Sequence, residues 1–258
     1  MKKYLRPLFN SFLGVALRNL IGFLPTLSLL ENKKTYLASD LFFWRTDQGY
    51  STIFKASDIL KKFYDEESDL FLIFFDKKGR EIFSKTLHFN NGIAELTIDT
   101  RLIGMEGLGT FCAFNILKNK SDKQIKATNR CYVGYGKKGS FSMVHGNLLA
   151  LYTNKLLSLR SSEPDSIKPA ISSKKGKYKY YLQKSNGEIF DNSLIFVNPL
   201  DRDISVSVSG NNVQIGSRCC EAIEVNKYDE IIVIESDFIF PRPIVFSENG
   251  DFIDVHHG

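Results

Sequence analysis

The feature that most restricts the fold of this chain is a change in the spacing of its apolar residues at Thr35. Before Thr35 they recur every three or four residues, as on one face of a helix. After it they alternate, or form short runs rich in aromatic and β-branched residues, at 35–45, 69–75, 93–98 and 110–117. Turn-forming sequences such as Asn-Asn-Gly at 90–92 lie between these runs. The pattern predicts an all-β body of short antiparallel strands.

The strand pattern stops between 158 and 179, where a stretch containing Ser, Pro and Asp runs into several lysines. Such composition predicts an exposed linker between domains. Strand-like runs then resume at 193–198, 204–208, 222–225, 231–235 and 244–246. We therefore expect a helix and lead-in over 1–34, a first β-sandwich module over 35–157, a linker over 158–179 and a second module over 180–258.

Two segments in the proposed modules resemble each other. Residues 139–145 and 250–256 share Gly, Phe, Val and His at a constant offset of 111 residues, and the same offset aligns Val133 with Ile244 and Tyr135 with Phe246. About seven short strands in each copy are typical of a β-sandwich. We therefore expect two tandem antiparallel β-sandwich modules of immunoglobulin-like architecture, a comparison that carries no function. A double cupin is disfavoured, because neither copy has the paired His and following Glu of a cupin metal site.

The first segment has the pattern of a basic amphipathic helix. Its Leu and Phe side chains fall on one stripe, and polar residues occupy the opposite side. The residues expected to contact a membrane surface or a partner are Lys2, Lys3, Arg6, Phe9, Phe12 and Arg18. Three interpretations stay open for this segment: a helix docked on the protein or a partner, a membrane-surface helix, and a signal peptide. Its apolar stretch is interrupted too early for a transmembrane span.

The positive charge of the chain lies almost entirely in this first segment. Residues 1–34 hold six basic residues and one acidic residue, which leaves 28 basic and 28 acidic residues in the remainder. A protein that neutralises several phosphates needs a basic surface on its folded body. The balanced body therefore argues against a nucleic-acid partner.

Few side chains are candidates for chemistry. On a strand, Asp254 and His256 share a face while His257 points to the other, so Asp254 and His256 could form half of a metal site. His145, at the equivalent place in the first module, could complete the site if the last strands of the modules meet. A structural role for these histidines explains the repeat equally well. The sequence contains no Gly-x-Ser-x-Gly, His-Glu-x-x-His or Cys-x-x-Cys motif and leaves any cofactor unidentified.

Aromatic residues beside polar ones are the candidates for ligand binding. Trp44, Tyr50, Tyr178 and Tyr181 lie near predicted loops and could stack on a sugar ring or anchor a protein, although packing in the core or on a sheet face is favoured at each position.

The sequence therefore favours a non-catalytic binding protein whose partner is a protein or a carbohydrate, held at a membrane surface or on a partner by its first helix. The alternative is a metal-dependent hydrolase or isomerase that uses the histidines of the last strands. We expect a cytoplasmic location, with peripheral attachment to a membrane left open. Whether the chain is an enzyme is not decided by its sequence.

Overall fold

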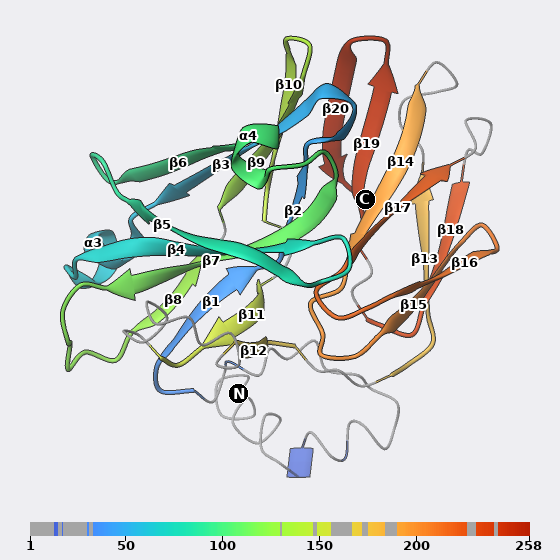
Figure 1. Ribbon diagram of the computed structural model, residues 1–258. Coiled ribbons are helices and arrows are strands. Elements are labelled where there is room, and N and C mark those ends of the chain that lie inside the picture. The colour runs from blue at the N-terminus through green and yellow to red at the C-terminus, as the bar shows by residue number, and fades with distance from the viewer. Residues whose placement is uncertain are drawn as a thin grey trace.

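The computed structural model describes residues 13, 14, 17, 30, 33–129, 131–146, 149–155, 167–171, 175–183, 190–225, 231–239 and 242–258. Over these residues the chain is an all-β, sandwich-like protein in which the strands form five four-stranded sheets (Figure 1). The short helical elements are the 3₁₀ turn η1 (Asp47–Gly49), α3 (Ile59–Tyr64) and α4 (Thr100–Ile103). The expectation of an all-β body is confirmed.

The first half of the chain forms three stacked layers. In Figure 1 we call them, from top to bottom, the upper, central and lower sheets. The upper sheet has the order β10 (Ser140–His145), β9 (Tyr132–Lys137), β3 (Tyr50–Ser57), β6 (Ile93–Ile98). The central sheet has the order β2 (Phe42–Arg45), β7 (Leu108–Leu117), β4 (Ser68–Asp76), β5 (Glu81–His88). The lower sheet has the order β12 (Lys168–Pro169), β11 (Leu149–Thr153), β1 (Tyr36–Asp40), β8 (Lys126–Asn129).

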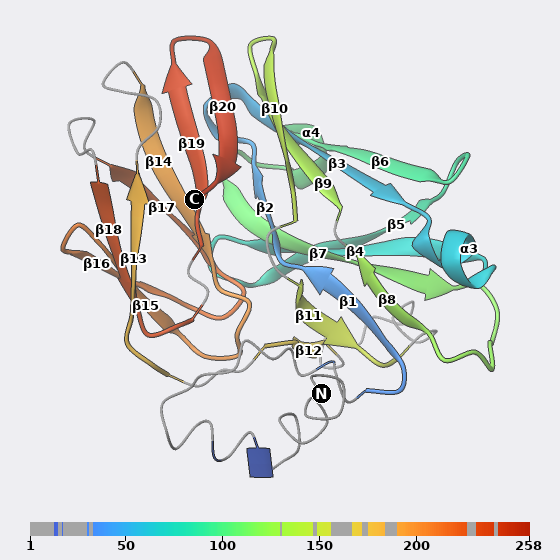
Figure 2. The same ribbon diagram turned by 180° about the vertical axis from the view of Figure 1, so that it is seen from behind.

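The second half forms two further layers beside the first, as both views show (Figures 1 and 2). The junction sheet lies against the first half and has the order β17 (Cys220–Val225), β14 (Asp191–Val197), β19 (Ile244–Asn249), β20 (Phe252–His257). The distal sheet lies beyond it and has the order β13 (Tyr178–Gln183), β18 (Ile231–Ser236), β15 (Ile204–Val208), β16 (Asn211–Ile215).

The two halves share one strand order. The central sheet pairs its strands as the distal sheet does, with β2, β7, β4 and β5 in the places of β13, β18, β15 and β16. The upper sheet corresponds in the same way to the junction sheet, with β10, β9, β3 and β6 in the places of β20, β19, β14 and β17. The first half adds the lower sheet, which has no counterpart among the described strands of the second half.

The immunoglobulin-like strand order is not the one observed. In an immunoglobulin constant domain the first strand, A, pairs with the second strand, B, in a sheet ordered A-B-E-D. Here β2, the first strand of the shared pattern, pairs instead with β7, the sixth strand of that pattern. The sandwich expectation is supported at the level of layers, whereas the immunoglobulin-like detail is not.

The core runs through all five layers. One cluster fills the space between the upper, central and junction sheets, and Phe246 of the junction sheet packs there against Phe43, Tyr50 and Tyr135 of the first half. A second cluster lies between the central and lower sheets, and a third lies mainly between the junction and distal sheets. The junction sheet is therefore apolar on both faces where neighbouring sheets cover it.

The exposed linker expected over 158–179 is contradicted at 167–171, whereas Lys175, Lys177 and Lys179 are exposed. Residues 168–169 form β12, which pairs with β11, and Ile167, Ala170 and Ile171 are buried. The cause is tertiary packing, because Ile167 belongs to the cluster between the central and lower sheets and Ile171 to the cluster of the junction and distal sheets. β13 also begins at Tyr178, inside the expected linker.

The helix predicted over 1–34 lies mostly outside the described residues, as do Lys2, Lys3, Arg6, Phe9, Phe12 and Arg18. Leu13 and Leu17 are described and are exposed. Among the described residues, no helix is long and apolar enough to cross a membrane.

Candidate functional site

A polar cleft lies where the junction sheet extends beyond the first half. The face of β14 that looks toward the first half carries Asp191, Ser193 and Ile195 in alternate positions. Ile195 is buried in the shared core, whereas Asp191 is exposed. The strand therefore changes from apolar to polar at the point where its cover ends, and the uncovered end borders a cleft of about 610 Å³.

Side chains from both halves line this cleft, which we call the junction cleft. The polar side chains come from β2 and η1 of the first half and from β14, β17 and β19 of the second half, and Leu108 of β7 adds an apolar group. The polar lining residues are Arg45, Asp47, Gln48, Asp191, Asn192, Ser193, Glu224 and Glu248. Glu224 stands directly opposite Ser193 on the neighbouring strand, and Glu248 stands opposite Asp191. Carboxylate, amide, hydroxyl and guanidinium groups are thus gathered at one place.

An ion network fixes Arg45 on the first-half side. Its guanidinium donates to both carboxylate oxygens of Asp47, at 2.8 and 2.9 Å, and lies 3.6 Å from Glu248. Lys137 donates to the other oxygen of Glu248 at 2.7 Å. Only 7% of the Arg45 side chain is exposed, against 26% for Asp47 and 22% for Glu248, so the guanidinium is the best shielded of the three groups. Two-point contact with Asp47 leaves the guanidinium little rotational freedom.

The ring of Tyr50 packs against two of the charged groups of this network. The Arg45 guanidinium carbon lies 3.7 Å from the centre of the Tyr50 ring, and the Lys137 ammonium lies 4.9 Å from it. Burial, together with the neighbouring Glu248, raises the pKa of Tyr50, so the phenol is neutral at physiological pH. Burial alone would raise the pKa of Glu248, but the hydrogen bond and charge of Lys137 outweigh it and hold that pKa below its usual value.

Gln48 at the edge of the cleft has an unusual backbone. Its φ of 49° is in the left-handed region. Of the six non-glycine residues with positive φ, Asn91, Lys138 and Ser209 are in two-residue hairpin turns and Asp65 caps α3. Gln48 and Arg218 also lie in tight turns, which are closed by the Tyr50 N–H on the Asp47 carbonyl and by the Cys219 N–H on the Gly216 carbonyl. The turn from Asp47 to Tyr50 therefore holds Gln48 at the edge of the cleft.

Both polar atoms of the Asn192 side chain form hydrogen bonds within the protein. Its amide donates to the Phe190 carbonyl at 3.0 Å and accepts from the Ser247 hydroxyl at 2.6 Å. Among the described residues, Ser193 and Glu224 form no hydrogen bond to another side chain, and both line the cleft. These two residues, with Gln48 and Asp191, form the open part of the site.

The aromatic residues that the sequence singled out do not gather at one site. Trp44 is fully buried, and its indole nitrogen donates to the Phe75 and Thr110 carbonyls at 3.1 and 3.2 Å. Tyr50 is also buried and supports Arg45. Neither ring offers an open face for stacking, because other side chains cover both. Tyr178 and Tyr181 lie on β13 of the distal sheet, where Tyr181 is 68% exposed.

The histidines lie together at the seam between the halves. β10 and β20 run side by side in both views (Figures 1 and 2), and the rings of His145 and His257 are 4.9 Å apart. His257 also hydrogen-bonds to the His145 carbonyl at 2.8 Å. As the strand period predicted, Asp254 and His256 share a face, 3.3 Å apart. The last strands of the two halves therefore do meet.

This meeting does not produce a metal centre in the described part of the chain, which contains no group of three or more His, Cys, Asp or Glu residues that could hold a metal ion. On β20, His257 faces His145 of β10, whereas Asp254 and His256 lie on the opposite face of the strand. The metal-dependent alternative gains no support from this geometry.

Sequence reasoning missed the second-half side of the cleft. Asp191, Ser193, Glu224 and Glu248 are polar residues near the ends of otherwise apolar strands. The sequence feature that could have identified them is a polar residue on the same strand face as the buried residues Ile195 and Phe246. Only knowledge of where the first half ends distinguishes this pattern from an ordinary strand end.

Comparison with known proteins gives no family. No protein-family model matches this chain, and no curated protein matches it. One matching solved structure is an α-L-rhamnosidase of Streptomyces avermitilis complexed with L-rhamnose, with 10% identity and a TM-score of 0.26 over 88% of this chain and 26% of that one. This chain thus spans about a quarter of that enzyme. Another is the Pleurotus ostreatus lectin in its apo form, with 10% identity and a TM-score of 0.25 over 90% of this chain and 80% of that one. Neither likeness is close enough to assign a family.

Proposed function

We propose that this chain is a non-catalytic binding protein that holds a carbohydrate in the junction cleft. The observation that carries the proposal is the gathering of hydrogen-bonding groups from both halves in a cleft of about 610 Å³. Small-molecule sites commonly have volumes in this range and use a few well-placed polar groups to orient the ligand. A sugar presents neighbouring hydroxyls that donate and accept together. Glu224 and Asp191 supply acceptors, and Gln48 and Ser193 supply both functions.

Preorganisation supports binding at this cleft. Arg45 is held by Asp47 and Tyr50 before any ligand arrives, so little side-chain entropy is lost on binding. The same geometry argues against Glu248 as a proton donor. Its carboxylate is paired with Lys137 and its pKa is lowered, whereas a general acid at neutral pH needs a raised pKa.

A glycan array followed by calorimetric titration of the best-bound glycan tests this proposal. Replacing Glu224 by Gln or Ser193 by Ala should weaken binding, for Glu224→Gln by about tenfold or more, because a charge-assisted hydrogen bond is lost. Tyr181→Ala is the matched control, since Tyr181 is exposed on the distal sheet. The proposal fails if no glycan binds, or if Tyr181→Ala abolishes binding and Glu224→Gln does not.

We also propose that the two halves are copies of one eight-stranded module. The equal strand orders of the central and distal sheets, and of the upper and junction sheets, support this origin. The domain limits near 35–157 and 180–258 remain part of the same proposal. An experimental structure with a different pairing in either half would contradict it.

Attachment through the first helix, to a membrane surface or a protein partner, remains a separate proposal. The basic residues and Leu and Phe stripe of residues 1–34 support it. Liposome flotation at low and high salt, with and without residues 2–25, tests the membrane case. Equal partitioning of both proteins would remove it. For the metal-dependent alternative, metal analysis of the purified protein is the matching test.

A further inference from the structure

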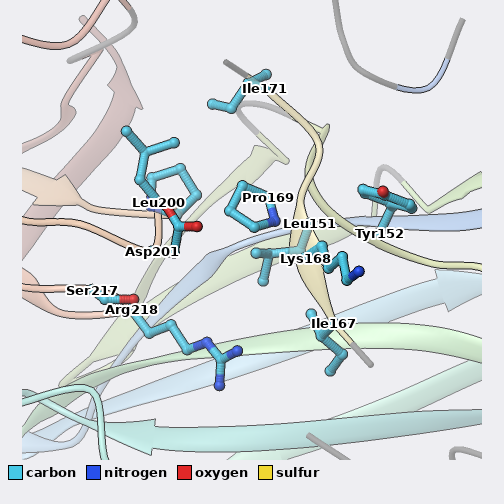
Figure 3. Close-up of a pocket in the computed structure, with 11 residues that line it drawn as sticks. Leu151, Tyr152, Ile167, Lys168, Pro169, Ile171, Leu200, Asp201, Ser217 and Arg218 are labelled. Atoms are coloured by element: carbon cyan, nitrogen blue, oxygen red, sulfur yellow. The ribbon is translucent and has the colours of Figure 1, made fainter. Parts of the chain in front are cut away.

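A second cavity lies on the other side of the contact between the halves, and its chemistry differs from that of the junction cleft. It has a volume of about 430 Å³. β11, β12 and Ile171 of the first half form one wall, and the loops that follow β14 and β16 form the other (Figure 3). Leu151, Ile167, Pro169 and Leu200 make most of the lining apolar.

Three charged residues line this cavity, Lys168, Asp201 and Arg218, and Arg218 is the one that lies over an aromatic ring. Arg218 extends from the second-half wall toward Ile167 in Figure 3, whereas the Lys168 amine points toward Tyr152. The Arg218 guanidinium carbon lies 5.3 Å from the centre of the Phe75 ring. Within the described residues, no carboxylate forms an ion pair with Arg218. Its guanidinium is therefore positioned against an aromatic ring and has donors available to a ligand.

The backbone that carries Arg218 is strained and firmly held. Its φ of 60° is in the left-handed region, which glycine adopts at lower cost. The Arg218 N–H donates to the Asn198 carbonyl at 2.8 Å, and the Arg218 carbonyl accepts from the Thr110 hydroxyl at 2.6 Å. Arg218 is the third residue of the turn from Gly216 to Cys219, in which the Cys219 N–H donates to the Gly216 carbonyl at 3.1 Å. The turn and these two hydrogen bonds fix the point from which the side chain extends.

Asn198 fixes the second-half wall. This fully buried amide donates to the Arg202, Ile215 and Gly216 carbonyls at 2.7 to 2.9 Å and accepts from the Leu200 N–H at 2.9 Å. The loop that carries Leu200 and the loop that carries Arg218 are thereby tied together. The cavity is preformed on this side, which lowers the entropic cost of binding.

We propose that this cavity binds a small carboxylate carried on an apolar body, with the carboxylate on Arg218 and the body against the leucine, isoleucine and proline walls. A planar guanidinium matches a carboxylate with two parallel hydrogen bonds. Burial of the apolar body supplies the remaining affinity.

Calorimetric titration of the full chain at pH 7 with octanoate, and with 1-octanol as the uncharged probe, tests the proposal. Wild-type protein should bind one octanoate. Arg218→Asn should weaken octanoate binding about tenfold or more and affect 1-octanol binding much less, because Asn tolerates a positive φ and removes the guanidinium that would pair with the carboxylate.

A second variant keeps the test decisive if Arg218→Asn folds poorly. Asp201→Trp places a large ring in the cavity from an exposed position and should weaken both probes. Lys168→Gln is the charge control and should change octanoate binding by less than Arg218→Asn does. Absence of octanoate binding to the wild type, or equal binding to the wild type, Arg218→Asn and Asp201→Trp, would overturn the proposal.

Discussion

The central and distal sheets occupy the same place in the strand order, yet their sequences look unlike. In β4 and β7 of the central sheet almost every residue is buried, as in the run Leu-Phe-Leu-Ile-Phe-Phe of β4. In β15 and β18 of the distal sheet, buried and more exposed residues alternate. The lower sheet causes the difference, because it covers the second face of the central sheet while nothing described covers that face of the distal sheet.

The residue pattern of these strands therefore depends more on whether a neighbouring sheet covers both of their faces than on their place in the strand order. The same principle places the junction cleft. Strands of the junction sheet are apolar where the first half covers them and polar at the end that it leaves open.

The two sheets should differ most in the loss of stability when a side chain is truncated on the face that the lower sheet covers in the central sheet, compared with the same face of the distal sheet. Phe114 of β7 is fully buried against the lower sheet, so Phe114→Ala should lower the free energy of unfolding by about 3 to 5 kcal/mol. Val233→Ala on the outer side of β18 should cost less than about 1 kcal/mol. Urea unfolding of both variants measures this contrast, and similar losses would show that cover does not distinguish the sheets.

A smaller effect is expected at the seam between the halves. The Ser142 hydroxyl accepts from the Val255 N–H at 3.0 Å, and Ser140 does the same for Ile253. Ser142→Ala should cost about 1 to 2 kcal/mol, because a backbone donor loses its partner. Ser207→Ala on the uncovered distal sheet should be within about 0.5 kcal/mol of wild type. If thermal unfolding shows equal effects, the serines do not join the two hairpins.

The ion network should make stability depend on pH in acid. Because the pKa of Glu248 is lower in the folded protein, its contribution is complete above the ordinary glutamate pKa of about 4.3. That contribution is lost as the pH falls through the lower folded-state value. Relative to Glu248→Gln, wild type should therefore lose stability between about pH 4.3 and more acidic values. Unfolding curves for both proteins that stay parallel over this range would contradict the network.

The smallest expected signal concerns thiol reactivity. Cys112 is fully buried, which raises its pKa to about 12, and burial also raises the pKa values of Cys131 and Cys220. Cys219 is only partly buried. A thiol reagent at neutral pH should label Cys219 first and the other three only after unfolding. Equally rapid labelling of Cys112 would show that the cover of the central sheet opens readily.

Much of the fold could be predicted from alternation and turn residues, because both are local. The shared face of Asp254 and His256 followed from the strand period, whereas their distance from His145 required the tertiary fold. Local patterns failed where packing decided the outcome. The stretch 158–179, predicted to be an exposed linker, contains β12 and the buried residues Ile167 and Ile171.

The candidate site was less predictable, because its residues come from five elements of two halves. The sequence draws attention to the aromatic rings of Trp44 and Tyr50, whereas the residues that line the cleft are Arg45, Asp47 and Gln48 between them. A ring such as Trp44 gives no local sign of whether a second sheet covers it. Tyr50, which was expected to stack on a ligand, is buried and packs against Arg45 instead.

Amide chemical-shift mapping by NMR, during titration with a glycan selected on an array, tests the central claim most directly. The account predicts that the amides that move most belong to Gln48, Ser193 and Glu224, which surround the junction cleft. Shifts confined to β13 around Tyr181, or no shifts at saturating glycan, would contradict it.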